Sequence, residues 1–329
     1  MILMKRRARL IKQLLFLGII LHYLSANVLA QRGIVYGPYS KIIFFADSLN
    51  AKNKTDTCMQ ILEHKLAVKD TLNLWLTYYN LAVCGAARGD AEQVCNYLLR
   101  CIVQSPLSFN LILTDTDFGF IHDTKQWRRI ESKIHALYLR NCPNITERKL
   151  AIELYHIFLK DQHARGLGLK KIDKAEFDHD EENLKRVEEI IEQYGWPTIS
   201  MVGKQSAQGA FYVIQHADLK VQMKYIRLIS EAARRKEINQ ESFAMLNDRI
   251  TTYKYGWQLY GTQVYQVRDT ITGKAIGGYK YFRIKDEKNV DKRRKDMGLI
   301  PVKEYFAVFG INYKAPVLDS LKMQNSLNQ

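Results

Sequence analysis

The stretch from Trp75 to Pro106, WLTYYNLAVCGAARGDAEQVCNYLLRCIVQSP, decides the fold of the first part of the chain. Its apolar residues recur every three or four positions on both sides of Gly89-Asp90, which is the spacing of an amphipathic helix. Ala82 and Gly85 are small enough to let two helices pack closely, and Pro106 cannot continue a helix. The stretch therefore predicts two helices joined by a turn at Gly89-Asp90.

The spacing of these residues resembles the tetratricopeptide repeat, a helical hairpin that usually occurs in arrays. A looser hairpin is expected from Tyr39 to Val68. Two hairpins are fewer than the roughly three repeats that such an array needs, so we expect them to pack on the helix around Trp127 or on the next domain. They either form a peptide-binding groove or serve as a spacer that buries its own core, and the sequence leaves both interpretations open.

The first thirty residues have the pattern of a secretion signal. Five basic residues lie between positions 5 and 12, the run LLFLGIIL at 14–21 is apolar, and Val28-Leu29-Ala30 offers small residues to a signal peptidase. The apolar run is too short to span a bilayer. We expect cleavage after Ala30, a periplasmic or secreted location, and no transmembrane segment after cleavage.

The composition is that of a folded protein, with 329 residues, 47% hydrophobic and 25% charged, and a formal net charge of +15. Removal of residues 1–30, which carry five Lys or Arg and no acid, lowers that charge to +10. The other basic residues are spread along the chain, so we expect no nucleic-acid partner. The five cysteines are expected to be buried apolar side chains, and no spacing of Cys or His indicates a metal or a cofactor.

The sequence also predicts the domain organisation. Asn141-Cys142-Pro143-Asn144 would stop one helix and allow the next to begin. Strand-like alternation occurs only around 257–267 and 279–284, so the predicted fold class is mainly α. We expect a signal peptide at 1–30, tetratricopeptide-like helical hairpins at 31–145, a helical domain with a small C-terminal β-hairpin at 146–312, and a flexible tail at 313–329.

Two predicted helices of the second domain carry polar residues where their apolar stripes continue. Asp161 and Arg165 extend the stripe of the first helix, at 146–165, and Asp180 and Asn183 extend that of the next, at 180–194. Buried polar groups must be hydrogen-bonded or paired. The residues therefore form either a structural network at the helix ends or a ligand pocket.

Further polar candidates follow. His216, Asp218 and Asp248 have the side chains of acid–base catalysts, and Arg249 has the fork that holds a carboxylate or phosphate. Structural hydrogen bonds and ion pairs are the alternative role for each. The complete set of ligand-binding candidates is Asp161, Arg165, Asp180, Asn183, Gln215, Arg249, Gln258, Tyr260, Thr262 and Gln263.

Many of these residues lie in short motifs, which are Gly195-Trp196-Pro197, Gln215-His216-Ala217-Asp218, Leu246-x-Asp248-Arg249 and Gln258-x-Tyr260-Gly261-Thr262-Gln263. The order of these motifs resembles that in an uncharacterised family of bacterial domains of unknown function. The resemblance covers about residues 146–310. Members of that family are often exported and are sometimes preceded by tetratricopeptide-like hairpins. The resemblance implies a mostly helical domain with a small β element, and it implies no reaction. One departure is Tyr255-Gly256-Trp257-Gln258, where many members carry a Gly-x-Pro-Gln turn.

These patterns predict an exported protein that binds a protein, peptide or glycan of the bacterial envelope. The alternative is a hydrolase or other ligand-processing enzyme with a polar site around His216. The sequence contains no nucleophile elbow, zinc-protease motif, P-loop or dinucleotide-binding fingerprint, so whether the chain is an enzyme stays open. The two alternatives differ in whether the polar side chains converge on an open cleft or are buried in mutual hydrogen bonds.

Overall fold

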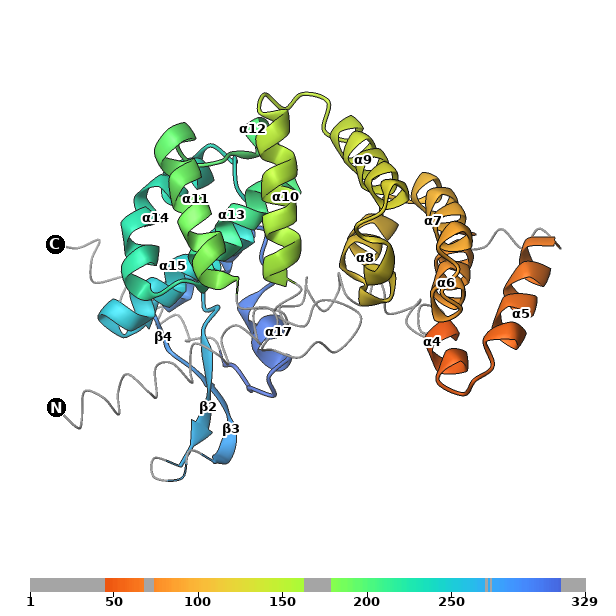
Figure 1. Ribbon diagram of the computed structural model, residues 1–329. Helices are drawn as coiled ribbons and strands as arrows, with labels where there is room; N and C mark the ends of the chain where they lie inside the picture. The colour runs from red at the N-terminus through yellow and green to blue at the C-terminus, as the bar shows by residue number, and fades with distance from the viewer. Residues whose placement is uncertain (1–44, 68–73, 163–178, 270–271, 273, 315–329) are drawn as a thin grey trace, which may run out of the picture. The chain divides into compact units, whose positions relative to one another are not determined.

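The structure is a computed structural model that describes residues 45–67, 74–162, 179–269, 272 and 274–314 (Figure 1). The predicted signal peptide at 1–30 and most of the predicted tail lie outside these residues. The predicted mainly α fold is confirmed, because helices dominate the described chain and its strands are short. Within the described residues, no helix is both long and apolar enough to cross a membrane.

In chain order, the helices before residue 163 are α4 (Phe45–Asn50), α5 (Thr55–Ala67), α6 (Leu74–Ala87), α7 (Ala91–Gln104), α8 (Ser108–Thr114), the 3-10 helix η1 (Thr116–Ile121), α9 (Lys125–Arg140) and α10 (Arg148–Gln162). After residue 178 they are α11 (Asp180–Tyr194), α12 (Ile199–Val202), α13 (Lys204–His216), α14 (Leu219–Arg234), α15 (Gln240–Tyr255), η4 (Glu287–Asn289), α16 (Val290–Asp296) and α17 (Val302–Ala307). The strands are β1 (Trp257–Gln258), β2 (Val264–Arg268), β3 (Ala275–Tyr281) and β4 (Arg283–Ile284).

The chain divides into two compact units, one of residues 32–214 and one that includes residues 215–329. Helix α13 runs across this division. The boundary expected at residues 145 and 146 and the likeness to the tetratricopeptide repeat stay predictions.

In the first unit, α6 and α7 form the hairpin expected from the opening stretch of sequence. The turn between them contains Gly89 at a φ of +72°, a conformation that glycine adopts without strain. The carboxylate of Asp90 accepts a hydrogen bond from the Gln93 amide at 2.9 Å and so caps α7. A Cβ on Gly85 would lie 3.2 Å from Cγ2 of Val94, so the two helices pack closely at this glycine.

The apolar core of this unit extends well beyond the hairpin. Ile130 and Ile134 of α9 and Tyr155 and Leu159 of α10 are buried in the same cluster as the residues of α4 to α8. Two further helices therefore supply the apolar surface that two hairpins lack.

Helix α10 also packs against α11, α12 and α13 within this unit. At its crossing with α13, a Cβ on Gly209 would lie only 2.6 Å from the carbonyl oxygen of Leu154. A side chain at this position would push the two helices apart, because the nearest atom belongs to the backbone. The close approach therefore fixes where α13 crosses α10.

In the second unit, the predicted β-hairpin is the antiparallel pair of β2 and β3, in which Val264 lies opposite Tyr281. The strand expected over 257–267 is divided, because β1 pairs in parallel with β4 and residues 259–263 form a loop between β1 and β2. An apolar cluster that includes Ile284, Val302 and Phe306 packs below this loop. A Cβ on Gly261 would lie 3.0 Å from side-chain carbons of Ile284 and Val302, which explains the glycine in the loop.

Cys58 of α5 and Cys84 of α6 meet in the core of the first unit. Both are fully buried free cysteines, and their Sγ atoms lie 2.6 Å apart. In an oxidising compartment we expect these two thiols to form a disulfide, because disulfides persist outside the cytosol. Alkylation of the denatured protein followed by mass spectrometry should then find three of the five thiols free, and all five in protein made in the cytosol.

The Cys58→Ser variant is the control for this count, because it should leave all four remaining thiols free in either compartment. Five free thiols in protein that has been exported would contradict the pairing.

Candidate functional site

The side chain of Asp248 is the centre of a buried polar network in the second unit. It lies on α15, is 0% exposed, and faces the loop of residues 259–263. Its carboxylate accepts hydrogen bonds from the amides of Leu259 (2.7 Å), Tyr260 (3.0 Å) and Thr262 (3.0 Å), and from the Thr262 hydroxyl (2.9 Å). Burial raises the pKa of Asp248, and these hydrogen bonds oppose the rise. The acceptor capacity of this carboxylate is therefore used within the fold.

Arg294 of α16 holds the other side of the same loop. It is 0% exposed, and its guanidinium donates to the carbonyl oxygens of Tyr260 at 2.6 Å and Ile300 at 2.6 Å. The guanidinium also lies 4.9 Å from the ring centre of Tyr305, a cation–π contact. Burial lowers the pKa of Arg294, and the negative charge of Asp248 is among the influences that oppose this. Asp248 thus accepts from N–H groups of the loop, while Arg294 donates to two of its C=O groups, those of Tyr260 and, at 3.4 Å, Gly261.

The polar residues expected on a ligand-facing edge belong to the same network. The Gln258 side chain accepts from the Gln263 amide at 2.7 Å and donates to the carbonyls of Gln263 (3.1 Å) and Phe282 (2.8 Å). The Gln263 side chain donates to the Met245 carbonyl at 3.3 Å. Gln258, Tyr260 and Thr262 are all buried, so these side chains hold the loop rather than line an open cleft.

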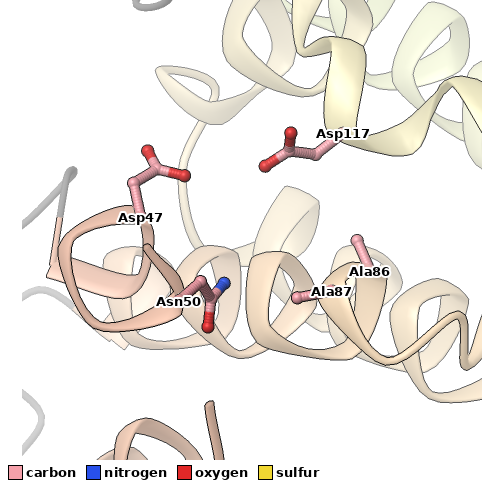
Figure 2. Close-up of a pocket in the computed structure, with 5 residues that line it drawn as sticks. All are labelled: Asp47, Asn50, Ala86, Ala87 and Asp117. Atoms are coloured by element: carbon pink, nitrogen blue, oxygen red, sulfur yellow. The ribbon is translucent and has the colours of Figure 1, made fainter. Parts of the chain in front are cut away.

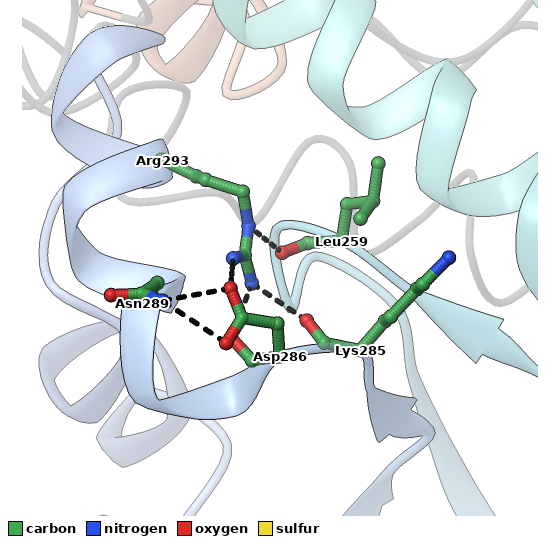
Figure 3. Close-up of polar contacts among 5 residues, drawn as sticks. All are labelled: Leu259, Lys285, Asp286, Asn289 and Arg293. Atoms are coloured by element: carbon green, nitrogen blue, oxygen red, sulfur yellow. Dashed lines mark hydrogen bonds and ion pairs between the residues drawn. The ribbon is translucent and has the colours of Figure 1, made fainter. Parts of the chain in front are cut away.

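A second arginine of α16 fixes the outer side of the loop. Arg293 donates from Nε to the Leu259 carbonyl at 3.0 Å and pairs with the Asp286 carboxylate at 2.9 Å (Figure 3). Its other terminal nitrogen donates to the carbonyls of Lys285 and Asp286, at 2.8 and 2.9 Å. Asp286 has a φ of +49°, and its side chain also accepts from Asn289, so this tight turn is held from two directions (Figure 3). The basic run at 292–295 thus supplies structural contacts through Arg293 and Arg294.

The candidates around His216 are partly structural as well. Asp218 is exposed, and its carboxylate caps α14 by accepting from the Val221 amide at 2.9 Å. Arg249 is buried and donates to the main-chain carbonyl of Gln215 at 2.9 Å, and burial lowers its pKa to about 10. Gln215 is also buried, whereas His216, at the end of α13, is half-buried.

The remaining candidates lie at the facing ends of α10 and α11. Asp161 is 1% exposed, and its carboxylate accepts from the Gln162 side chain at 2.7 Å. Asp180 opens α11 and is exposed, whereas Asn183, one turn later, is 3% exposed. Arg165 lies outside the described residues.

An open groove runs between α10 and α11. It has a volume of about 500 Å³ and is lined by Glu153, His156, Ile157, Lys160, Glu182, Asn183, Lys185, Arg186 and Glu189. Arg186 is neutralised across the groove by Glu153 and along its own helix by Glu189. Lys160 and Lys185 have no carboxylate within ion-pair distance in the described part of the chain, and Nδ2 of Asn183 has no hydrogen-bond partner there. The lining of the groove therefore includes hydrogen-bond donors, on Lys160, Lys185 and Asn183, that are not paired with an acceptor in the described residues.

A smaller pocket of about 240 Å³ lies among the first helices. Asp47 and Asn50 of α4, Ala86 and Ala87 of α6, and Asp117 of η1 line it (Figure 2). The carboxylates of Asp47 and Asp117 point into the same space (Figure 2). This pocket is acidic, and Oδ1 of Asn50 in its wall has no hydrogen-bond partner among the described residues.

Three residues that are not among the candidates named from the sequence come together in the structure. Glu131 and His135 of α9 and His156 of α10 place one ligand atom each within 4.8 Å of one another. The spacing of Glu131 and His135, four residues apart on one helix, could have been recognised in the sequence. His156 could not, because it joins them only when α9 and α10 pack together.

Helices α14 to α17 and strands β1 to β4 thus form a helical unit with a small β element, organised around a buried polar network. Residues 173–317, which contain these elements, match a family of unknown function (DUF6624). The predicted resemblance to an uncharacterised domain family is thereby confirmed. Searches of curated proteins and of solved structures found no match to the chain.

We expect Asp248→Ala to destabilise the second unit strongly. The substitution leaves three amides and one hydroxyl without their acceptor and removes a negative charge that acts on the buried Arg294. Loss of one partner from a buried charged network costs about 3–5 kcal/mol. Urea denaturation followed by circular dichroism would measure this change.

Asp218→Asn is the matched control, since asparagine caps a helix as well as aspartate does and the change should be near zero. An Asp248→Ala protein as stable as the control would contradict the structural role of this carboxylate.

Proposed function

We propose that the protein is an exported binding protein of the bacterial envelope that holds an anionic group in the groove between α10 and α11. The observation that carries the proposal is the unused donor set of the groove. Lys160 and Lys185 bring positive charge, and the buried Nδ2 of Asn183 lacks an acceptor within the described residues. A carboxylate or phosphate is the kind of acceptor that ammonium and amide donors bind.

The size and the remaining charges of the groove support a small ligand or one segment of a polymer. Its volume of about 500 Å³ falls within the range of roughly 300–1,000 Å³ that is usual for small-molecule sites. Glu182 adds a negative charge at the same groove, so a ligand with both signs of charge, such as an acidic peptide with a free amine, would be matched at both. The proposed export rests on the N-terminal sequence pattern.

The hydrolase alternative is less well supported. A general acid or base must reach the proton that it transfers. Asp248 is buried with its oxygens hydrogen-bonded to the loop, and Asp218 caps a helix. His216 is then the one candidate left of the three that the sequence offered, with no second catalytic group assigned to it.

A thermal-shift screen followed by calorimetry tests the binding proposal. The probes are acidic dipeptides, uronic-acid oligosaccharides and phosphorylated sugars. A probe that raises Tm should bind about tenfold or more weakly to the Lys160→Gln/Lys185→Gln variant, because a hydrogen bond to a charged group contributes about 1.5–3 kcal/mol. Binding should also weaken as salt is added.

The matched control removes two exposed lysines from another part of the same unit, as Lys52→Gln/Lys65→Gln. It should bind the probe like the unaltered protein. Equal loss of binding in both double variants would show that net charge, and not the groove, attracts the anion.

His216→Ala separates the two candidate functions. We expect this variant to bind the same probe with unchanged affinity, because His216 does not line the groove. Loss of binding, or loss of a measurable turnover of the probe, would favour the enzyme around His216 instead.

A further inference from the structure

Three side chains outside the polar network combine the donors of a transition-metal site. Nε2 of His135 and Nε2 of His156 lie 2.8 Å apart, and Oε1 of Glu131 lies 3.8 Å from Nε2 of His156. The two histidine rings stand at 89° to each other, with their centres 4.9 Å apart. Glu131 and His135 share one face of α9 because they are four residues apart.

The short contact between the two rings also suits a bound cation. Two neutral rings can hold the contact at 2.8 Å only if one Nε2 carries a proton and the other accepts it. If that proton is carried on Nδ1 instead, both Nε2 lone pairs face the same space and repel unless a cation lies between them.

The helices that carry these residues are held together by contacts of neighbouring side chains. The rings of Tyr138 on α9 and Tyr155 on α10 stack with their centres 4.4 Å apart and their planes at 13°. The Tyr138 hydroxyl shares a hydrogen bond of 2.7 Å with Ser206, which in turn donates to the Ala151 carbonyl of α10 at 2.6 Å. The three ligands therefore stand on a rigid frame, as a metal site requires.

We propose that Glu131, His135 and His156 bind a divalent transition-metal ion, of which Zn²⁺ fits the donors best. Two imidazoles and one carboxylate suit zinc and its neighbours in the first transition row, whereas Mg²⁺ and Ca²⁺ prefer oxygen ligands alone. Three protein ligands leave a fourth position of a tetrahedral ion open. The side chains of Glu131 and His156 are 34% and 35% exposed, so an ion can reach them from solvent.

This site is independent of the anion proposed for the groove, although His156 belongs to both. The groove proposal depends on Lys160, Lys185 and Asn183, none of which is a ligand of the proposed metal. Either proposal can therefore fail without the other.

The test is a titration of the untagged, reduced, full-length protein with Zn²⁺ and, separately, with Co²⁺. Calorimetry should find one Zn²⁺ site that is lost in His135→Ala/His156→Ala. The loss of affinity should exceed the ~10–100-fold that substitutions outside the ligand set typically cost. Co²⁺ should give visible d–d absorption in the unaltered protein and none in the variant.

Two further variants keep the test decisive. Glu131→Gln removes one ligand from a half-exposed position, so it should weaken zinc binding even if the double variant fails to fold. His64→Ala removes an exposed histidine of α5 and should bind like the unaltered protein. The proposal is overturned if the unaltered protein binds no Zn²⁺, or if both ligand variants bind it as tightly as the His64→Ala control.

Discussion

One short loop, residues 259–263, is hydrogen-bonded by two buried side chains of opposite charge, Asp248 and Arg294. The Asp248 carboxylate takes the loop's N–H groups and the Arg294 guanidinium takes the Tyr260 carbonyl, so the peptide groups of the loop lie between the two charges. A buried charge is costly unless hydrogen bonds and an opposite charge compensate it. The loop supplies the hydrogen bonds for both ions, and each ion reduces the cost of burying the other.

Much of the second unit depends on this arrangement. Asp248 comes from α15 and Arg294 from α16, while β1 ends where the loop starts and β2 begins where the loop ends. The Tyr305 hydroxyl of α17 donates to the Thr262 carbonyl at 2.9 Å, which joins the last helix to the same loop. These helices and strands are thus joined through one set of polar contacts, beside the apolar cluster around Phe306.

Local signals in the sequence were sufficient for most of the helices. The apolar stripe of Leu184, Val187 and Ile191 with Gly195 at its end predicted a helix over 180–194, and α11 has these bounds. Gly89-Asp90 likewise located the turn before α7. The pairing of β1 with β4 was not predictable, because two residues per strand carry no alternation and the pairing depends on the loop contacts.

The candidate sites likewise combine features that the local sequence predicts with features that depend on packing. The sequence identified Asp248, Gln258 and Thr262 as unusual polar residues, but it could not tell a ligand site from a structural network, since this depends on which donors surround each side chain. It also identified Asn183 on the buried face of its helix. The groove around Asn183 and the cluster of Glu131, His135 and His156 required the packing of α9, α10 and α11, and only the first and second of those three ligands share a helix.

The amides of Leu259, Tyr260 and Thr262 have a common acceptor, and this has a kinetic consequence. Loops usually exchange their amide hydrogens with solvent early, through small local openings. In this loop no single amide can leave without exposing the buried Asp248 carboxylate and breaking the grip of Arg294. The loop is thereby coupled to the slow, cooperative opening of its whole unit, and a segment without regular secondary structure shares the lifetime of the core.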